Sequence, residues 1–157
     1  MNPPCAALLR PALAQEARAM AEMSRRLIEA GLGWRYTPQR IAALIGDRET
    51  VALVAHDASR LQGFAVMQFG DAQAHLVLLC VEPSQRQRGI GRRLTEWLLE
   101  SARVAGIESI GLELRADNAA ALAFYRRLGF AQTQLVPGYY EGQIPARRMT
   151  LRLAVRQ

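Results

Sequence analysis

The chain has 157 residues, of which 50% are hydrophobic, and this size and composition predict one domain around a single core. The longest apolar run, 76–81, is far shorter than the ~20 residues of a membrane-spanning helix, and residues 1–9 lack the features of a signal peptide, so we expect a cytoplasmic protein. The net charge of +6 suits an anionic ligand. However, all 20 basic residues are arginines scattered along the chain, which codon bias explains better than a nucleic-acid surface.

Hydrophobic periodicity and turn residues predict a mixed order of strands and helices. In chain order these are a strand at 8–10, helices at 13–28 and 37–46, strands at 51–56, 64–69 and 75–81, a helix at 90–105, a strand at 109–115, a helix at 117–128, and strands at 130–136 and 147–155. Asp117 and Asn118 are typical caps for the last helix, and Pro137-Gly138 is expected to turn between the last two strands. This order predicts an α/β (α+β) fold, in which helices cover the faces of a mixed sheet.

The segment at 81–92 reads Val-Glu-Pro-Ser-Gln-Arg-Gln-Arg-Gly-Ile-Gly-Arg and joins a predicted buried strand to a predicted helix. The first amides of a helix have no partner within the helix, and with the helix dipole they attract an anion. Gly89 and Gly91 allow the backbone to approach a pyrophosphate closely. A Walker motif is excluded because no Gly-Lys-Ser/Thr follows, and a Rossmann motif because Leu94 stands where a third glycine is needed. The glycine pair alone fits a strand-to-helix turn with a solvated basic face equally well.

The same segment resembles the acetyl-CoA signature of the GNAT superfamily of N-acetyltransferases. The resemblance continues through Leu-Glu-Leu-Arg-Ala-Asp-Asn at 112–118 and Ala-Phe-Tyr-Arg-Arg-Leu-Gly-Phe at 123–130. These motifs look closest to those of the branch that acetylates protein N-termini, such as the ribosomal-protein alanine acetyltransferases. The resemblance implies one GNAT domain over 1–157, with a mixed, mostly antiparallel seven-stranded sheet and about four helices on its faces.

The resemblance also implies that acetyl-CoA is the acetyl donor and that no metal is involved. The pantetheine arm is expected to enter between the diverging strands at 75–81 and 109–115. Its backbone partners are expected to be Leu79, Cys80 and Val81. The pyrophosphate is expected to be bound by Arg86, Gln87, Arg88, Gly89, Ile90, Gly91 and Arg92. Asn118 is expected to contact the donor further along, and it fits equally well as the N-cap of its helix.

Two residues within the matched motifs are candidate catalysts. Tyr125 is the candidate general acid, because a phenol has a reference pKa of ~10 against ~8.5 for a leaving thiol. The same residue also fits simple packing beside Leu122 and Leu128. Glu113 is the candidate general base, which would take the proton of the amine directly or through water. Alternatively, Glu113 pairs with Arg115 on the same strand face, which would lower its pKa and weaken it as a base.

The acceptor is expected beside the loop between the first two helices and the last hairpin, where Trp34, Tyr36, Tyr139 and Tyr140 are candidate contacts. Packing of loops on the core explains each of these aromatic residues as well. The family match favours a peptide or protein α-amine, attacked directly in a ternary complex. An α-amine with a pKa of ~8 is also easier to deprotonate than a lysine at ~10.4. A small-molecule amine or amino acid, and a non-catalytic acyl-CoA-binding module, are the alternatives, and a homodimer is left open.

The remaining reactive side chains have no pattern of their own. His56 and His75 lack the spacing of a metal site or a catalytic triad and are interpreted as structural or surface residues. Cys5 and Cys80 lack metal spacing as well and are interpreted as reduced thiols. Cys80 is the thiol whose position beside the expected donor path would suit a covalent acetyl-enzyme.

Overall fold

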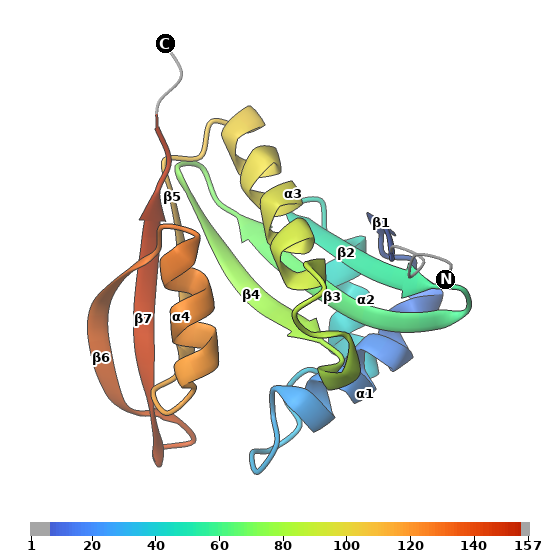
Figure 1. Cartoon of the computed structure of the whole chain (residues 1–157), viewed down its shortest axis with the longest axis horizontal. Helices are drawn as coiled ribbons and strands as arrows, with labels where there is room; N and C mark the ends of the chain where they lie inside the picture. The colour runs from blue at the N-terminus through green and yellow to red at the C-terminus, as the bar shows by residue number, and fades with distance from the viewer. Residues whose placement is uncertain (1–6, 155–157) are drawn as a thin grey trace.

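The structure, a computed structural model, describes residues 7–154 and consists of one sheet with helices on both faces (Figure 1). The strands are β1 (Leu8–Pro11), β2 (Thr50–Asp57), β3 (Arg60–Phe69), β4 (Gln73–Val81), β5 (Ser109–Arg115), β6 (Ala131–Tyr140) and β7 (Ile144–Arg152). The α-helices are α1 (Ala17–Leu27), α2 (Pro38–Gly46), α3 (Ile90–Val104) and α4 (Ala119–Arg127), with 3-10 turns at Ala14–Glu16 and Pro83–Gln85. The predicted fold class is confirmed. No helix in the described range is long and apolar enough to span a bilayer.

The sheet opens between β4 and β5, and this opening determines where a ligand can enter. The strand order is β1-β2-β3-β4-β5-β7-β6, and β4 with β5 is the parallel pair among antiparallel neighbours. The two parallel strands pair over their first residues and stop at His75 opposite Gly111. Beyond that point they diverge, and Figure 1 shows β4 leaning away from β5 and β7. The expected divergence of the two strands is therefore confirmed.

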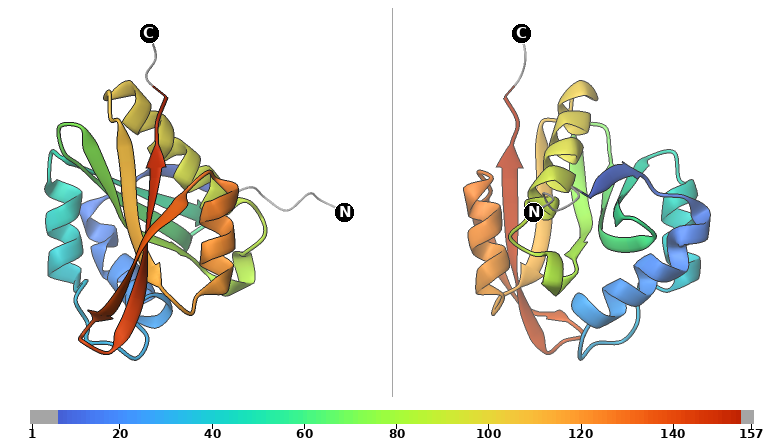
Figure 2. Two further views of the ribbon diagram at one scale, coloured as in Figure 1. Left: turned by 90° about the vertical axis from the view of Figure 1, so that its left-hand side faces the viewer. Right: turned by 45° about the vertical axis from the view of Figure 1, so that its right-hand side comes forward.

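Two hydrophobic clusters hold the helices on opposite faces of the sheet (Figure 2). One cluster packs α3 and α4 on the sheet and contains Leu98, Leu112 and Tyr125. The other packs α1 and α2 on the opposite face and contains Met20 and Ile41. Their residues come from the helical and alternating periodicities of the sequence, because such spacing places apolar side chains on one face of each element.

A bulge in β4 exchanges the faces of this strand. The pairing of β3 with β4 shifts between Val66 and Met67, so that one residue of β4 has no direct partner. As a result, Leu76 belongs to the cluster beneath α3, whereas Leu78 and Cys80 belong to the cluster beneath α1 and α2. Bulges bend a strand and redirect its side chains, and this one lies where β4 leaves β5.

The last hairpin differs from the prediction. Pro137-Gly138 does not turn the chain: β6 continues through it to Tyr140, and the turn lies at 141–143, where Glu141 and Gly142 have positive φ angles of 53° and 72°. The sheet tolerates Pro137 because β6 is an edge strand, on which a missing amide hydrogen need not break the ladder. The register of β6 and β7 shifts between Val136 and Tyr140, so Pro137 and Gly138 lie in a bulge of β6. Accordingly β7 begins at Ile144, and the predicted end of this strand at 155 lies outside the described residues.

Candidate active site

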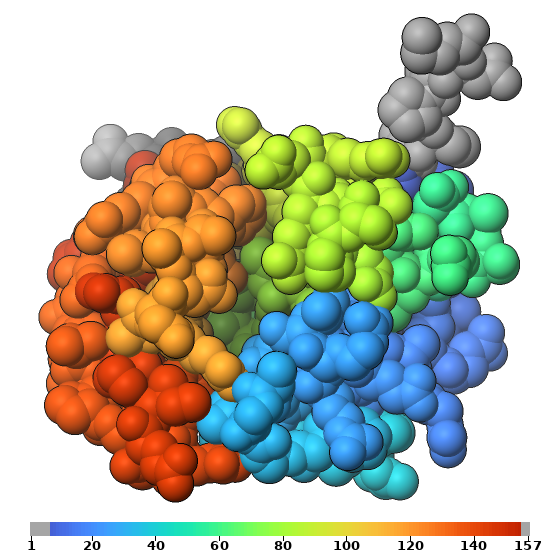
Figure 3. All heavy atoms as spheres, turned by 60° about the horizontal axis from the view of Figure 1, so that its bottom comes forward, coloured from blue at the N-terminus to red at the C-terminus, as the bar shows by residue number. Residues whose placement is uncertain are grey.

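The opening between β4 and β5 forms a hollow in the molecular surface. Figure 3 shows green atoms, in the colour range of β4, at the bottom of a recess between the orange and red C-terminal elements, the yellow-green start of α3 and the blue N-terminal helices. Beyond His75, one edge of β4 has no neighbouring strand. This edge includes backbone groups of Leu79, Cys80 and Val81 that can pair with an extended ligand.

The turn before α3 presents backbone amides toward the same end of the hollow. Gln87 and Gly89 adopt left-handed conformations, with φ angles of 65° and 81°, and Gly89 is the N-cap of α3. Within the described residues no side chain caps this helix, and Arg93 is the residue whose amide reaches the carbonyl of Gly89, at 2.9 Å. The amides of Ile90, Gly91 and Arg92 therefore remain available to an anion.

Gly89 faces open space at this turn. A Cβ built on Gly89 has no described atom within 4 Å, so the space above it is free for a ligand. The left-handed conformation of Gln87, by contrast, is strained for a residue with a side chain, which is common where a loop is shaped for binding. A 15-residue helix that begins with free amides and an open glycine turn fits a phosphorylated group.

The arginines at this turn are partly engaged with the protein. The Arg86 Nε donates to the carbonyl of Val81 at 3.3 Å, and the Arg92 Nε donates to Glu96 at 2.8 Å. Arg93 reaches back to the carbonyl of Ala7 at 2.8 Å. Arg88 is exposed at the rim. These contacts leave guanidinium groups around the turn with further donors for an anion.

Asn118 is the N-cap of α4. Its side chain accepts a hydrogen bond from the amide of Ala121 at 3.1 Å, which confirms the predicted capping role. The residue is exposed, so its amide nitrogen is free to meet a ligand as well.

Tyr125 lies on α4 within the cluster beneath α3 and α4, with an exposed fraction of 9%. Its ring makes edge contacts with Phe124 and Phe130 at centroid distances of 5.2 and 5.6 Å. Burial, with a smaller contribution from nearby Tyr140, raises the pKa of Tyr125 well above its usual range. Packing and a proton-donating role are thus compatible, because the phenol keeps its proton at every working pH. The raised pKa makes the phenol a weaker acid, so transfer of its proton to a thiolate is less favourable than the reference pKa values predict.

Glu113 lies on the opposite face of the sheet from Tyr125. Its neighbours Leu112 and Leu114 belong to the cluster that contains Tyr125, so strand alternation turns Glu113 to the other face. The alternative interpretation, in which Glu113 pairs with Arg115, is wrong. The Arg115 Nη2 donates to the carbonyl of Ala30 at 2.5 Å, and its Nε is buried without a partner in the described residues.

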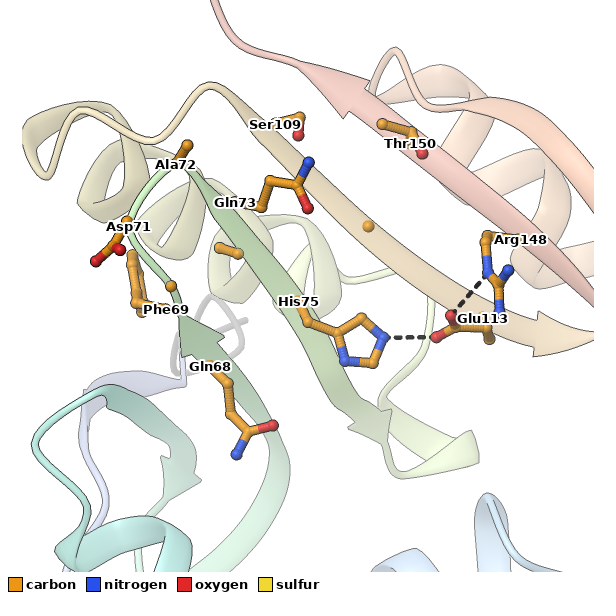
Figure 4. A pocket seen from close by; sticks show the side chains of 13 residues that line it. Gln68, Phe69, Asp71, Ala72, Gln73, His75, Ser109, Glu113, Arg148 and Thr150 are labelled. Atoms are coloured by element: carbon orange, nitrogen blue, oxygen red, sulfur yellow. Dashed lines mark hydrogen bonds and ion pairs between the residues drawn. The ribbon is translucent and has the colours of Figure 1, made fainter.

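The partners of Glu113 come instead from the neighbouring strands. His75 Nε2 lies 2.5 Å from Oε2, and the Arg148 Nε donates to Oε1 at 3.1 Å (Figure 4). Arg148 is the direct cross-strand neighbour of Glu113 in the β5–β7 register, which brings it closer than Arg115 two residues along the strand. The hydrogen bond from His75, and to a lesser degree the hydrogen bond and the charge of Arg148, lower the pKa of Glu113 despite its burial. His75, interpreted from the sequence as a structural or surface residue, is thus partly exposed and lies in hydrogen-bond contact with Glu113.

The four predicted acceptor contacts separate into two groups. Trp34 is part of the packing of α1: its Nε1 donates to the carbonyl of Ala21 at 3.3 Å, and the Arg25 guanidinium lies 4.8 Å from the ring centroid. Tyr139 and Tyr140 form an edge-to-face pair at 4.9 Å. Burial raises the pKa of Tyr140 to about 12, and the charges of Tyr139 and Glu113 add to this effect.

Tyr36 belongs with this tyrosine pair. It lies within electrostatic range of both Tyr139 and Tyr140, while its ring also stacks under the Arg40 guanidinium at 4.6 Å. Glu141, in the β6–β7 turn, accepts a hydrogen bond from the amide of Gly33 at 2.6 Å and so links this turn to the loop between α1 and α2. The structure therefore places Tyr36 near Tyr139 and Tyr140, places these two tyrosines within electrostatic range of Glu113, and leaves Trp34 in the packing of α1.

Comparison with known protein families shows to which family this chain belongs. The family model described as Acetyltransferase (GNAT) family matches residues 15–130, which is most of the chain. The chain belongs to the GNAT family. The matched range includes the open strand edge, the glycine turn, Glu113 and Tyr125.

Individual GNAT proteins are similar in sequence to only part of this chain. The chain is 38% identical over 81 residues to the [ribosomal protein bS18]-alanine N-acetyltransferase of Salmonella typhimurium, which is 52% of this chain and 55% of that protein. The chain thus spans about half the length of these curated relatives. It is 39% identical over 79 residues to a mycothiol acetyltransferase of Clavibacter michiganensis, covering 50% of this chain and 26% of that protein. The crystal structure of the Escherichia coli ribosomal-protein-S18-alanine N-acetyltransferase has the same fold, with a TM-score of 0.83, 24% identity and 96% coverage of both chains.

The sequence did not predict the two residues that contact Glu113, namely His75 and Arg148. Neither belongs to a sequence motif. The signal available for His75 was its place near the start of a strand expected to run beside the strand of Glu113. The signal for Arg148 was weaker, because its place opposite Glu113 depends on the register of β7 against β5, which the sequence did not predict.

Proposed function

We propose that this chain is an enzyme that transfers the acetyl group of acetyl-CoA to the α-amine of a protein or peptide N-terminus, by direct attack in a ternary complex. The observation that carries the proposal is the open edge of β4 leading to the free amides of α3, with Tyr125 and Glu113 on the two faces of the same opening. All of these parts lie in one domain, which we take to be residues 1–157. Membership of the GNAT family supports the same reaction.

The chemistry of the opening suits this donor. The backbone of Leu79, Cys80 and Val81 offers hydrogen bonds to the amides of a pantetheine arm, and the turn at 86–92 offers unpaired amides and arginines to a pyrophosphate. Asn118 lies at the start of the next helix, where it can contact the donor. When bound, acetyl-CoA supplies an activated thioester.

Tyr125 and Glu113 are the side chains proposed to serve this chemistry. Tyr125 stays protonated because it is buried, and it would donate that proton to the departing sulfur. Glu113 lies on the face where Tyr36, Tyr139 and Tyr140 gather, so an amine that enters between these tyrosines would meet it. Cys80 is not assigned a covalent role, because burial raises the pKa of its thiol to about 12 and keeps it from acting as a thiolate.

A protein α-amine is the acceptor that the surroundings favour. Arg35, Arg115 and Arg148 lie around the tyrosine cluster, and this positive charge disfavours polyamines and similar polycations. The Salmonella relative carries the name of an N-acetyltransferase that acts on alanine of ribosomal protein bS18. The second candidate acceptor is a small-molecule amine, and the similarity to a mycothiol acetyltransferase favours it.

The test is a competition between matched acceptors. The protein is incubated with acetyl-CoA and with a lysine-free peptide bearing a free N-terminus, a blocked peptide bearing lysine, and cysteine- and glucosamine-type small amines. Products are identified by mass spectrometry. We expect acetylation of the free α-amine, faster than that of lysine. Acetylation of small amines alone would show that the acceptor is a small-molecule amine and not a protein N-terminus. A chain that binds acetyl-CoA without forming any product would be a binding module.

Replacement of Cys80 by alanine is expected to leave kcat within about threefold of the wild-type value, because the proposed transfer forms no acetyl-cysteine. The side chain is buried in the cluster beneath α1 and α2, so the free energy of unfolding should fall by about 1 kcal/mol. Steady-state kinetics and urea unfolding of the variant measure both quantities. Loss of turnover with normal folding and normal acetyl-CoA affinity would contradict direct transfer.

A further inference from the structure

A hydrogen-bonded group that contains a histidine lies on the face of the sheet that the acceptor would reach. His75 on β4, Glu113 on β5 and Arg148 on β7 form a continuous chain of hydrogen bonds across three strands (Figure 4). The side chain of Glu113 is only 14% exposed, whereas that of His75 is 45% exposed. The histidine is therefore the member of this group that a ligand can approach most freely.

Both carboxylate oxygens of Glu113 are already engaged. Oε2 meets His75 and Oε1 meets Arg148, and these hydrogen bonds lower the pKa of Glu113. A carboxylate with a lowered pKa has a weaker affinity for the proton of an ammonium group. Glu113 is thus a poorer base than its position in the family motif predicts.

The state of Glu113 determines the tautomer of His75. An ionised carboxylate can only accept hydrogen bonds, so the Nε2 of His75 must donate its hydrogen to Oε2. In the neutral imidazole the Nδ1 then has a free lone pair. Figure 4 shows this second nitrogen pointing away from Glu113, and within the described residues it has no hydrogen-bond partner. A histidine held by a carboxylate at one nitrogen and free at the other is the arrangement that acts as a base in hydrolytic triads.

The surroundings of His75 leave room for an amine and water. The ring lines a cavity of about 860 Å³ that extends along the start of β4 and β5. Across β3 its register partner is the neutral Gln68, and Asp71 in the β3–β4 turn is the other acidic group that lines this cavity. Tyr139 and Tyr140 of β6 lie within electrostatic range of Glu113. Glu113 is therefore the charged group in hydrogen-bond contact with the imidazole.

We propose that His75 is the base of the transfer, accepting the amine proton at Nδ1 directly or through one water, and that Glu113 and Arg148 are positioning residues that orient the imidazole and stabilise its protonated form. This inference rests on the proposed function. In the step, the amine nitrogen forms a bond to the thioester carbonyl carbon, and the carbon–sulfur bond breaks with its electron pair leaving on sulfur. One amine proton passes to His75, and the sulfur receives a proton from Tyr125. Solvent returns the proton from His75 to Tyr125, so that amide and thiol are the net products.

The test compares His75→Gln with the wild-type enzyme over a pH range. A glutamine amide nitrogen replaces Nε2 as the donor to Glu113, but it provides no nitrogen that accepts a proton. We expect kcat/KM to fall by about 100-fold at about pH 8, with an unchanged Kd for acetyl-CoA. The ratio of wild-type to variant kcat/KM, in which the pKa of the acceptor amine cancels, should shrink as the pH falls, because a general base contributes less to the rate at lower pH. In His75→Ala, added imidazole should restore part of the rate.

His56→Gln is the matched control. His56 also lies 2.5 Å from a glutamate, Glu16, but on β2 and far from the opening, so its replacement should leave the pH profile unchanged. A His75→Gln enzyme that stays within threefold of wild type, or a ratio that is flat over the pH range while Glu113→Gln abolishes turnover, would overturn the proposal and return the base to Glu113. A wild-type protein that forms no acetylated amine would overturn the proposed function itself, and the inference with it.

Discussion

Replacement of Tyr125 by phenylalanine is expected to lower kcat by about 100- to 1,000-fold, because the departing sulfur would lose its proton donor. The Kd for acetyl-CoA should stay within about twofold, since the ring and its contacts with Phe124 and Phe130 are retained. Within residues 7–154 the hydroxyl has no hydrogen-bond partner, so its removal should change the free energy of unfolding by about 1 kcal/mol or less. Single-turnover kinetics with a free-N-terminus peptide and calorimetric titration of acetyl-CoA measure these quantities.

This result would also separate an enzyme from a binding module, because a module has no turnover to lose. A Tyr125→Phe protein with the wild-type kcat would contradict the assignment of Tyr125 as the acid. The tyrosine would then serve only the packing of α4 on the sheet.

Replacement of Gly89 by alanine is expected to weaken the Kd for coenzyme A by at least about tenfold, which corresponds to about 1.4 kcal/mol. The new Cβ points into space that no described atom occupies, where the pyrophosphate is proposed to bind. The left-handed conformation, with φ at 81°, adds a strain of about 1 kcal/mol for alanine. Titration calorimetry with coenzyme A and urea unfolding distinguish the two effects.

Gly106 provides a control for the strain alone. It lies just beyond the other end of the same helix, has a φ angle of 77° and also has open space around its Cβ position. Gly106→Ala should therefore lose the same ~1 kcal/mol of stability while it binds coenzyme A normally. If both variants weakened binding equally, the effect at Gly89 would be general strain, and the proposed phosphate site would lose its support.

Local sequence patterns predicted the parts of the site that a short segment determines by itself. The glycine turn at 86–92 and the capping of α4 by Asn118 each depend on a few consecutive residues, and the structure shows both. The divergence of β4 and β5 followed from the family resemblance, and the structure confirms it. Periodicity then located the strands and helices along the chain, because burial follows the geometry of each element.

The partners of Glu113 could not be found in this way, because they depend on registers between strands far apart in the sequence. The local pattern offered Arg115, two residues away on the same face, yet the hydrogen bonds come from His75 and Arg148. In the last hairpin, Pro137-Gly138 does not form the turn that its composition predicts, because the edge strand β6 continues through these residues with a bulge. The position of Arg148 opposite Glu113 depends on the register of β7 against β5, which the sequence did not predict.

Amide hydrogen exchange with and without saturating coenzyme A tests the central claim most directly, namely that the donor lies along the open edge of β4 and ends at the amides of α3. Peptides that cover 76–92 should exchange more slowly in the presence of coenzyme A, because the ligand would bind their free amides, whereas peptides that cover α2 at 38–46 should be unaffected. Slower exchange confined to segments outside 76–92 would contradict the proposed donor site, and with it the assignment of this opening as the place of acetyl transfer.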